Sequence, residues 1–445
     1  MEGSSIALAM FAAMMVLLFS GQRMFGIIGF VAVIAALVLW SDRGEYTLAF
    51  AQTLKVMDWT VLMSLPMFIF MGYVMAETRL VDDLYRMFHV WFGPIPGGLA
   101  IGTVLLMTMV AAINGLSVAG MAIGCTIVLP EILKRGYDKR FVVGLIQGSS
   151  SLGILIPPSV VLVLYAQIAR QPVGQLWLAG LVPGLMMAGF FMLYSIIRCS
   201  FNPALGPPLP REERMSVTWG ERFRLLGAGF VPFFILGAMM VPFVTGYTRL
   251  VESSVIGALA ASLLALLRGR LTFKVLENSA RETLMVSCMF LWIILAALAF
   301  GAVFDGLHAA DALENLFVDN LHLNPWVILI LMQLSFVVMG TFLDDTAMLV
   351  IVAPLYVPLV AQLDLGVDHP LIWFGVLYTI TCQIAYLTPP FGYNLFLMRA
   401  MAGNTVSMAE IFVAIIPSIA IMILTLVVLM IFPEIALWLP NMFAK

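Results

Sequence analysis

Two segments of this chain place a pair of prolines inside a long apolar run. One reads GSSSLGILIPPSVVLVLYA from Gly148 to Ala166, and the other reads CQIAYLTPPFGYNLFLMRA from Cys382 to Ala400. A proline inside a helix removes a backbone donor and clashes with the preceding turn, so each pair predicts a helix that stops and restarts. In lipid, the freed backbone groups need partners within the protein or in a water-filled cavity. Broken helices at corresponding positions of two halves are the sequence feature that best indicates a binding site inside a membrane protein.

The composition supports a polytopic membrane protein. Of 445 residues, 62% are hydrophobic and only 11% are charged, against about 25% charged in soluble domains. The net charge of −3 gives no reason to expect a nucleic-acid partner. The four cysteines are scattered without metal or disulfide spacing, and no cofactor motif or P-loop is present. The lipid bilayer is therefore the expected environment, and ATP is not the expected energy source.

Apolar runs long enough to cross or re-enter a membrane recur along the chain. They fall at about 5–20, 25–40, 60–77, 98–132, 141–169, 173–198, 225–245, 250–268, 282–304, 323–362, 371–402 and 408–432. Runs 98–132 and 323–362 are too long for one helix. Each has small and polar residues at its middle, AAINGLSVAG (Ala111–Gly120) and MGTFLDDTAM (Met339–Met348), and each precedes a Pro-Pro segment. We expect both to be re-entrant helical hairpins.

The order of these pieces indicates a duplication. Pro157-Pro158 and Pro389-Pro390 are 232 residues apart, and the matching pieces RGYD and LGVD, which end at Asp138 and Asp368, are 230 apart. Both halves read as hairpin, short charged turn and broken helix.

Loop charges predict that the two halves are inverted. Basic loops at 134–140, 198–224 and 268–281 should stay in the cytoplasm, and the acidic segment 305–319 should be periplasmic. The first hairpin then enters from the cytoplasm and the second from the periplasm, with both chain termini periplasmic.

The hairpin tips carry the residues most suited to ion chemistry. Asp344 and Asp345 lie within an apolar run, where a charge costs at least ~2.5–3.5 kcal/mol, so a functional role is the first hypothesis. The alternative is that one of them caps a helix. At the opposite tip Gly115 permits a sharp turn, and Asn114 and Ser117 supply oxygen atoms. Oxygen ligands suit a hard cation such as sodium.

Polar residues also flank both helix breaks. Ser149, Ser150 and Ser151 precede the first break, and Thr381, Thr388 and Asn394 surround the second. Such residues often bond only their own helix or a neighbour. The N-termini of half-helices suit an anionic group, and loose carbonyls suit cations. Since neither tip contains Lys or Arg, an anion moved together with cations is the expected cargo.

These segments resemble the large membrane subunit of TRAP (tripartite ATP-independent periplasmic) transporters. The first half resembles the family from INGLSVAG through RGYD to ILIPPSVV, and the second in GTFLDDTAM and LTPPFGYNLF. The resemblance implies uptake of a small organic anion, a carboxylate or sulfonate, coupled to the sodium gradient across the bacterial inner membrane. It also implies a periplasmic substrate-binding protein, a small four-helix membrane subunit, and an elevator-type transport domain that moves past a scaffold.

The same resemblance implies the site residues. Sodium is expected at Asn114, Gly115, Ser117, Ser149, Ser150, Ser151, Gly340, Asp344, Asp345 and Thr388, and substrate at Ser117, Ser150, Pro157, Asp345, Thr388, Pro390 and Asn394. One difference stands at the first tip. Many relatives have Ser-Gly-Ser followed by Ala-Asp, whereas this chain has Asn114-Gly115-Leu116-Ser117, with Gly120 near the position of the Asp.

The resulting fold is an all-α membrane protein with two inverted repeats. Its parts are N-terminal scaffold spans (1–94), a first transport-domain half (95–170, tip near 113–120, break near 148–160), scaffold spans with a cytoplasmic loop at 199–224 (171–281), a scaffold span with the periplasmic acidic segment (282–322), a second transport-domain half (323–404, tip near 339–346, break near 382–394) and a C-terminal scaffold span (405–445).

Three other functions remain as alternatives. A stand-alone ion-coupled anion carrier would need no substrate-binding protein. A channel would suit the midplane breaks, although the hairpins favour alternating access. An intramembrane aspartyl enzyme would need two carboxylates facing each other across a site. The adjacent Asp344 and Asp345 tend to point apart, so we expect no enzyme.

Overall fold

The computed structural model describes residues 3–18, 20, 22–39, 51, 54, 56–57, 59–78, 80–115, 117–208, 218–307, 324–341, 343, 345–390 and 392–443. Over these ranges the chain is helical almost throughout and contains no strand, which confirms the predicted all-α fold. Seven of the described helices are long and apolar enough to cross a membrane, or eight if the two bent parts of α18 count as one span. Asp344, the segment 308–323 and residues 209–217 of the predicted cytoplasmic loop lie outside the described residues.

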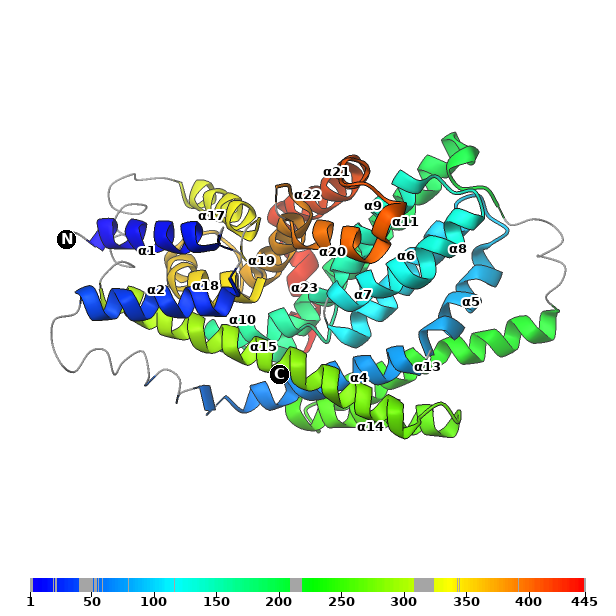
Figure 1. Cartoon of the computed structure of the whole chain (residues 1–445), viewed down its shortest axis with the longest axis horizontal. Coiled ribbons are helices and arrows are strands. Elements are labelled where there is room, and N and C mark those ends of the chain that lie inside the picture. Colours follow the sequence, from blue (N-terminus) through cyan, green and yellow to red (C-terminus); the bar gives the residue numbers. More distant parts are fainter. Residues whose placement is uncertain are drawn as a thin grey trace.

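One layer of helices runs along the lower side of Figure 1. Its members are α2 (Met24–Leu39), α4 (Ser64–Glu77), α5 (Leu80–Phe92), α13 (Trp219–Val244), α14 (Leu250–Leu267) and α15 (Phe273–Gly306), with α1 (Gly3–Leu18) beside α2. Within the layer, α15 packs on α2 and α4, α14 packs on α4 and α13, and α13 packs on α5. The layer also packs on the neighbouring segments, since α5 packs on α6 (Gly98–Asn114) and α15 packs on α18 (Asp345–Gln362).

Both long apolar runs fold back on themselves as helical hairpins. The first consists of α6 (Gly98–Asn114), α7 (Ser117–Ile123), a π-helical turn (Gly124–Val128) and α8 (Leu129–Lys134). The second consists of α17 (Pro325–Gly340) and α18 (Asp345–Gln362), and α18 bends by 56° between its two parts. Figure 1 places the first hairpin to the right and the second to the left.

A buried tyrosine closes the base of the first hairpin. The hydroxyl of Tyr137, in the turn after α8, accepts a hydrogen bond from the Leu99 amide at 3.3 Å. Burial raises the pKa of Tyr137 to about 12. The hydroxyl therefore stays neutral at physiological pH and serves as a structural bridge between the two arms.

Both following helices break at the proline pairs. In the first half, α9 (Lys139–Ser150) passes through a 3-10 turn (Ser151–Ile154) and restarts as α10 (Val160–Ile168). In the second half, α19 (Pro370–Leu387) restarts as α20 (Tyr393–Ala402). Ser159 caps α10 by accepting a hydrogen bond from the Leu162 amide at 3.2 Å. Side-chain capping thus replaces one of the backbone bonds lost at the first break.

Each half packs its restarted helix against the hairpin of the other half. Helix α20 packs on α7, and α10 packs on α18. This exchange is the packing that two repeats related by a twofold axis would give. The remaining helices are α11 (Val173–Phe201), α21 (Met408–Ala414), α22 (Ile416–Ile431) and α23 (Glu434–Phe443).

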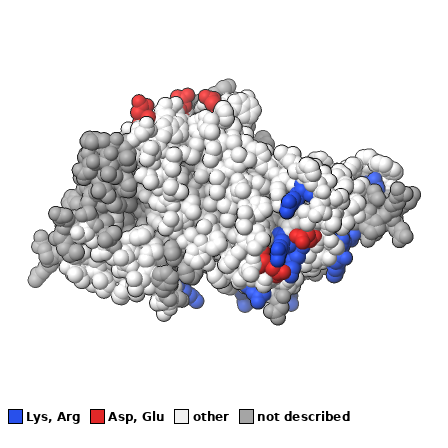
Figure 2. Space-filling view, turned by 90° about the horizontal axis from the view of Figure 1, so that it is seen from above, with Lys and Arg blue, Asp and Glu red and all other residues white. Residues whose placement is uncertain are grey.

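Basic side chains gather toward one end of the long axis. In Figure 2 most Lys and Arg lie toward the right, while the acidic side chains at the upper left have no Lys or Arg beside them. Contacts join the predicted cytoplasmic loops at the basic end. Arg86 of α5 pairs with Glu221 of α13 at 3.1 Å, and the Asp138 amide donates to the Leu205 carbonyl at 3.0 Å. Of the three basic loops predicted from charge alone, the first (134–140) and the second (198–224) both lie at this basic end.

Candidate functional site

The tip of the first hairpin contacts both helix breaks. The Ser117 hydroxyl donates to Oδ1 of Asn394 at 3.0 Å, and both side chains are buried. On the other side of the tip, the Val160 amide donates to the Gly115 carbonyl at 3.5 Å. Gly115 has φ +64, and a Cβ there would lie 2.2 Å from the carbonyl oxygen of Pro158. Only glycine permits both this conformation and this approach.

The three serines before the first break bond their own helix. The hydroxyls of Ser149, Ser150 and Ser151 donate to carbonyls of the preceding turn at 2.6, 3.0 and 2.7 Å. All three are completely buried. Their single protons are used, but the hydroxyl oxygens keep lone pairs that can still accept a hydrogen bond or bind a cation.

The tip of the second hairpin buries a carboxylate. Asp345 begins α18 and is 7% exposed, and its Oδ1 accepts from the Thr346 amide at 2.8 Å. Tyr386 also hydrogen-bonds this carboxylate, and the Tyr378 hydroxyl donates to the Asp345 carbonyl at 2.6 Å. No Lys or Arg among the described residues forms an ion pair with Asp345. Asp344, the other residue of the predicted acidic pair, lies outside the described residues.

The second hairpin also packs tightly against the second broken helix. A Cβ on Gly340 would lie 2.5 Å from the Cβ of Ala385, just before the break. Thr388 is the C-cap residue directly after α19, and its hydroxyl donates to the Ile384 carbonyl at 2.7 Å. The Gly392 amide donates to the Thr388 carbonyl at 3.2 Å, which closes the loop around the prolines. The second hairpin therefore packs directly on the helix that leads into the second break.

The remaining predicted residues divide by exposure. Pro157 is buried inside the first break, whereas Pro390 is exposed at the second. Helix α6 ends at Asn114, and the side chain of Asn114 is not among the described ones. Of the predicted residues, Ser117 and Asn394 are thus in direct contact across the halves, whereas the Gly115 backbone contacts Pro158 and Val160 within the first half.

Buried glutamines are the part of the site that sequence reasoning missed. Nε2 of Gln383 donates to the Ser151 carbonyl at 3.0 Å, which links the two broken helices where they approach each other. The Thr381 hydroxyl donates to Oε1 of Gln333. Several buried amide atoms have no hydrogen-bond partner among the described residues: Nε2 and Oε1 of Gln147, Oε1 of Gln383, Nε2 of Gln333 and Nδ2 of Asn394. The sequence signal that could have found these residues is a single glutamine inside an apolar run.

The arrangement favours cation binding beside buried, uncharged polar groups. A buried carboxylate, serine and threonine hydroxyls, amide oxygens and the carbonyls of broken helices are all oxygen donors. Hard cations prefer such donors. Amide N–H groups and helix N-termini at the same breaks can receive an anion.

Comparison with known proteins gives consistent matches. The family model described as "Tripartite ATP-independent periplasmic transporter, DctM component" matches residues 10–435. The chain is 29% identical to the C4-dicarboxylate TRAP transporter large permease protein DctM of Pseudomonas aeruginosa, over 85% of this chain and 86% of the relative. It is 27% identical to the ectoine TRAP transporter large permease protein TeaC of Halomonas elongata, over 97% of this chain and 98% of that relative.

Solved structures show the same general fold at low sequence identity. The YdaH transporter of Alcanivorax borkumensis superposes with a TM-score of 0.58 at 13% identity, covering 88% of this chain and 87% of that one. The MtrF protein of Neisseria gonorrhoeae gives a TM-score of 0.58 at 14% identity, with 88% and 83% covered.

Proposed function

Since this chain belongs to the DctM component family of the tripartite ATP-independent periplasmic transporters, we propose that it imports a small organic anion across the bacterial inner membrane with the sodium gradient as driving force. It is a multi-pass transporter permease and not an enzyme. It works with a small four-helix membrane subunit and receives its substrate from a periplasmic binding protein.

The buried carboxylate of Asp345 is the observation that supports sodium coupling. Removing a carboxylate from water without a compensating charge is costly, and no described basic side chain pairs with this one. A bound sodium ion would supply the missing charge. Thr388, Ser117 and the serines before the first break supply further oxygen atoms within the same pair of tips and breaks.

The lack of a basic residue at the tips supports an anion held by neutral donors. Helix α20 starts at Tyr393, and α10 starts at Val160, so two helix N-termini lie at the breaks. Nδ2 of Asn394 is a buried donor without a described partner. The compounds named for relatives include C4-dicarboxylates, ectoine and sialic acid, which carry a carboxylate, and isethionate, which carries a sulfonate. We therefore propose a carboxylate or sulfonate as the recognised group.

The packing supports an elevator-type movement of two bodies. The first body contains α2, α4, α13, α14 and α15, which pack on one another, and the second contains the hairpins and broken helices α6–α10 and α17–α20, which pack on each other and touch the first body through α15 and α18. In this mechanism the second body carries substrate and sodium past the first. Substrate and sodium would reach the opposite side together because the tips and breaks that bind them move as a unit.

Reconstitution tests this proposal directly. The chain and its small membrane partner are placed in proteoliposomes, and the substrate-loaded binding protein is added outside with or without an inward sodium gradient. Uptake that requires both the binding protein and sodium is expected. Uptake without the binding protein would favour the stand-alone carrier, and uptake indifferent to sodium would exclude the ion sites named here.

A further inference from the structure

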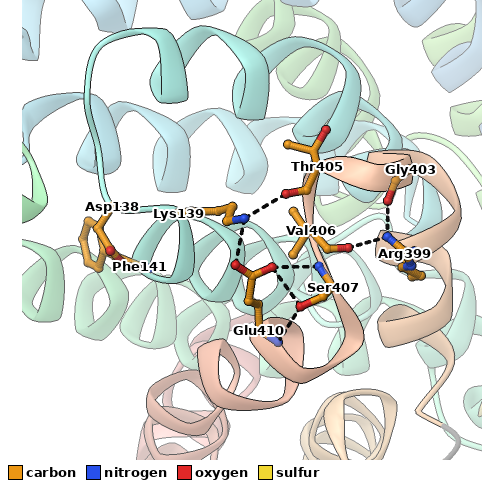
Figure 3. Close-up of polar contacts among 9 residues, drawn as sticks. All are labelled: Asp138, Lys139, Phe141, Arg399, Gly403, Thr405, Val406, Ser407 and Glu410. Carbon is orange, nitrogen blue, oxygen red and sulfur yellow. Dashed lines mark hydrogen bonds and ion pairs between the residues drawn. The ribbon is translucent and has the colours of Figure 1, made fainter.

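One end of the second body carries a network of polar contacts to which the proposed function assigns no role (Figure 3). Lys139, the first residue of α9, forms an ion pair with Glu410 of α21, with 2.7 Å between Nζ and Oε1. The same ammonium group donates to the carbonyl of Thr405 at 3.0 Å. The side chains of Lys139 and Glu410 are 35% and 26% exposed, so water only partly surrounds the pair. The start of α9 is thereby tied to the turn that follows α20.

That turn, residues 403–407, is also held by α20. Arg399, in the last turn of α20, donates to the carbonyls of Gly403 and Val406, the latter at 2.6 Å. Ser407 caps α21 by accepting from the Glu410 amide, and its own amide donates to the Glu410 carboxylate at 2.8 Å. A cation from each half therefore contacts the same short turn, Lys139 from the first half and Arg399 from the second.

Beyond this network, α9 and the segment α21–α22 run side by side in the same direction. A Cβ on Gly144 would lie 2.0 Å from the carbonyl oxygen of Ala414, and one on Gly148 would lie 2.7 Å from Oγ of Ser418. The Ser418 hydroxyl donates to the Gly144 carbonyl at 2.7 Å. The contacts advance in step along both helices, so the ion pair is the first of several that fix their register.

The other broken helix is joined to the same segment. Nε1 of Trp373 in α19 donates to the Leu429 carbonyl in α22 at 2.9 Å. Helix α22 packs on α9, α11 and α19, and α21 packs on α9 and α20. These contacts connect 408–431 to both helices that lead into the breaks.

We propose that Lys139, Glu410 and Arg399 are positioning residues for transport, which hold α9, α20 and α21–α22 together as one unit. Ser151 stands twelve residues after Lys139, about 18 Å along a helix, and Asn394 is the second residue of α20, whose last turn contains Arg399. The network thus sets the separation between the serines of one break and Asn394 of the other. The inference rests on the proposed function. It also moves 408–431 out of the scaffold, where the sequence-based division placed it.

Chemical bridging tests whether the unit stays closed during transport. In a background where the exposed Cys288 is replaced by serine, the double variant Lys139→Cys/Glu410→Cys removes the ion pair. A short bis-maleimide then bridges the two thiols in proteoliposomes containing the complete transporter. The unbridged variant should need about two- to fivefold more sodium for half-maximal uptake, in line with a partly exposed ion pair. Bridging should restore the wild-type value while uptake continues.

Two outcomes would overturn the inference. Uptake that stops on bridging would mean that α21 moves relative to α9. A wild-type sodium requirement in the unbridged variant would mean that the pair positions nothing. If the wild-type complex takes up substrate without sodium, the proposed coupling fails, and the positioning role is then read from the substrate KM in the same variants.

Charge exchange provides the matched control. Lys139→Glu should raise the sodium requirement as the cysteine variant does. Lys139→Glu/Glu410→Lys should lower it again by the share due to the ion pair, because the exchanged side chains cannot bond the Ser407 amide and the Thr405 carbonyl. The pair Arg86–Glu221 also joins two helices, at 3.1 Å, but lies between α5 and α13. Arg86→Glu should leave the sodium requirement unchanged. A change of equal size there would show that any interhelical charge affects uptake and would refute the specific role.

Discussion

Asp345 is the described residue whose environment is most costly without a ligand. Its carboxylate receives hydrogen bonds from Thr346 and Tyr386 but no ion pair from a described Lys or Arg. Asp345→Asn keeps the size of the side chain and removes the charge. Because a contact to a charged group contributes about 1.5–3 kcal/mol, the sodium concentration for half-maximal uptake should rise about tenfold or more.

An exposed carboxylate in the same half serves as the control for Asp345. Asp364→Asn, in the turn after α18, should leave the sodium requirement at the wild-type value. The sodium requirement of both variants is measured as uptake into proteoliposomes at increasing sodium concentrations. Equal sodium curves for Asp345→Asn and the wild type would remove this carboxylate from the ion site.

Gly115 combines a left-handed backbone with the closest approach of the first tip to a break. Gly115→Ala would add a Cβ 2.2 Å from the Pro158 carbonyl oxygen at φ +64. Gly269 has φ +66 with no atom within 4 Å of an added Cβ. Both alanines carry a backbone cost of roughly 1–2 kcal/mol, but only the first displaces the tip. We expect Gly115→Ala to lose most uptake and Gly269→Ala to retain it at equal membrane abundance, whereas equal uptake would mean that this approach is dispensable.

At the scale of elements, the second helix break depends on its two prolines. Pro389→Ala/Pro390→Ala restores two backbone donors and removes a penalty of about 3 kcal/mol per residue against helix. The helix should then continue from α19 into α20 and move Asn394 away from Ser117. Uptake should fall to background while the protein remains in the membrane.

The control for the proline change uses a proline that a helix already tolerates. Pro242 lies inside α13, which continues through it without a break. Pro242→Ala should leave uptake near the wild-type level. Sodium-dependent uptake in the double-alanine variant at the second break would show that transport does not require the interruption.

The helix breaks could be predicted from sequence because their causes are local. Two adjacent prolines stop a helix in any surroundings, and Gly115 inside an apolar run marks a turn. The contact between Ser117 and Asn394 could not be predicted, because it joins residues 277 positions apart and depends on how the halves pack. The same holds for Gln383 and Ser151. Sequence alone also could not decide that Ser149–Ser151 bond their own helix, since hydroxyls bond neighbouring helices as readily.

At the scale of the whole molecule, Lys and Arg gather toward one end of the long axis on the face shown in Figure 2. The turn after α8 is hydrogen-bonded to the loop after α11, and Lys134 and Arg198 lie in the last turns of these two helices, while Arg224 lies near the start of α13. Short loops rich in Lys and Arg are retained in the cytoplasm. The base of the first hairpin lies at this end, whereas the base of the second hairpin carries Asp364 and Asp368 without Lys or Arg.

The equivalent turns at the two hairpin bases provide a test of inversion. Lys134 and Asp368 are both exposed; Lys134 directly precedes the piece RGYD, and Asp368 ends the matching piece LGVD. In a Cys288→Ser background, Lys134→Cys and Asp368→Cys are each treated in spheroplasts with a membrane-impermeant maleimide. Asp368→Cys should react in intact spheroplasts, and Lys134→Cys only after disruption, because inverted repeats place equivalent turns on opposite sides. Labelling of both turns from one side would make the repeats parallel, and the two hairpins could not then meet at the midplane from opposite surfaces.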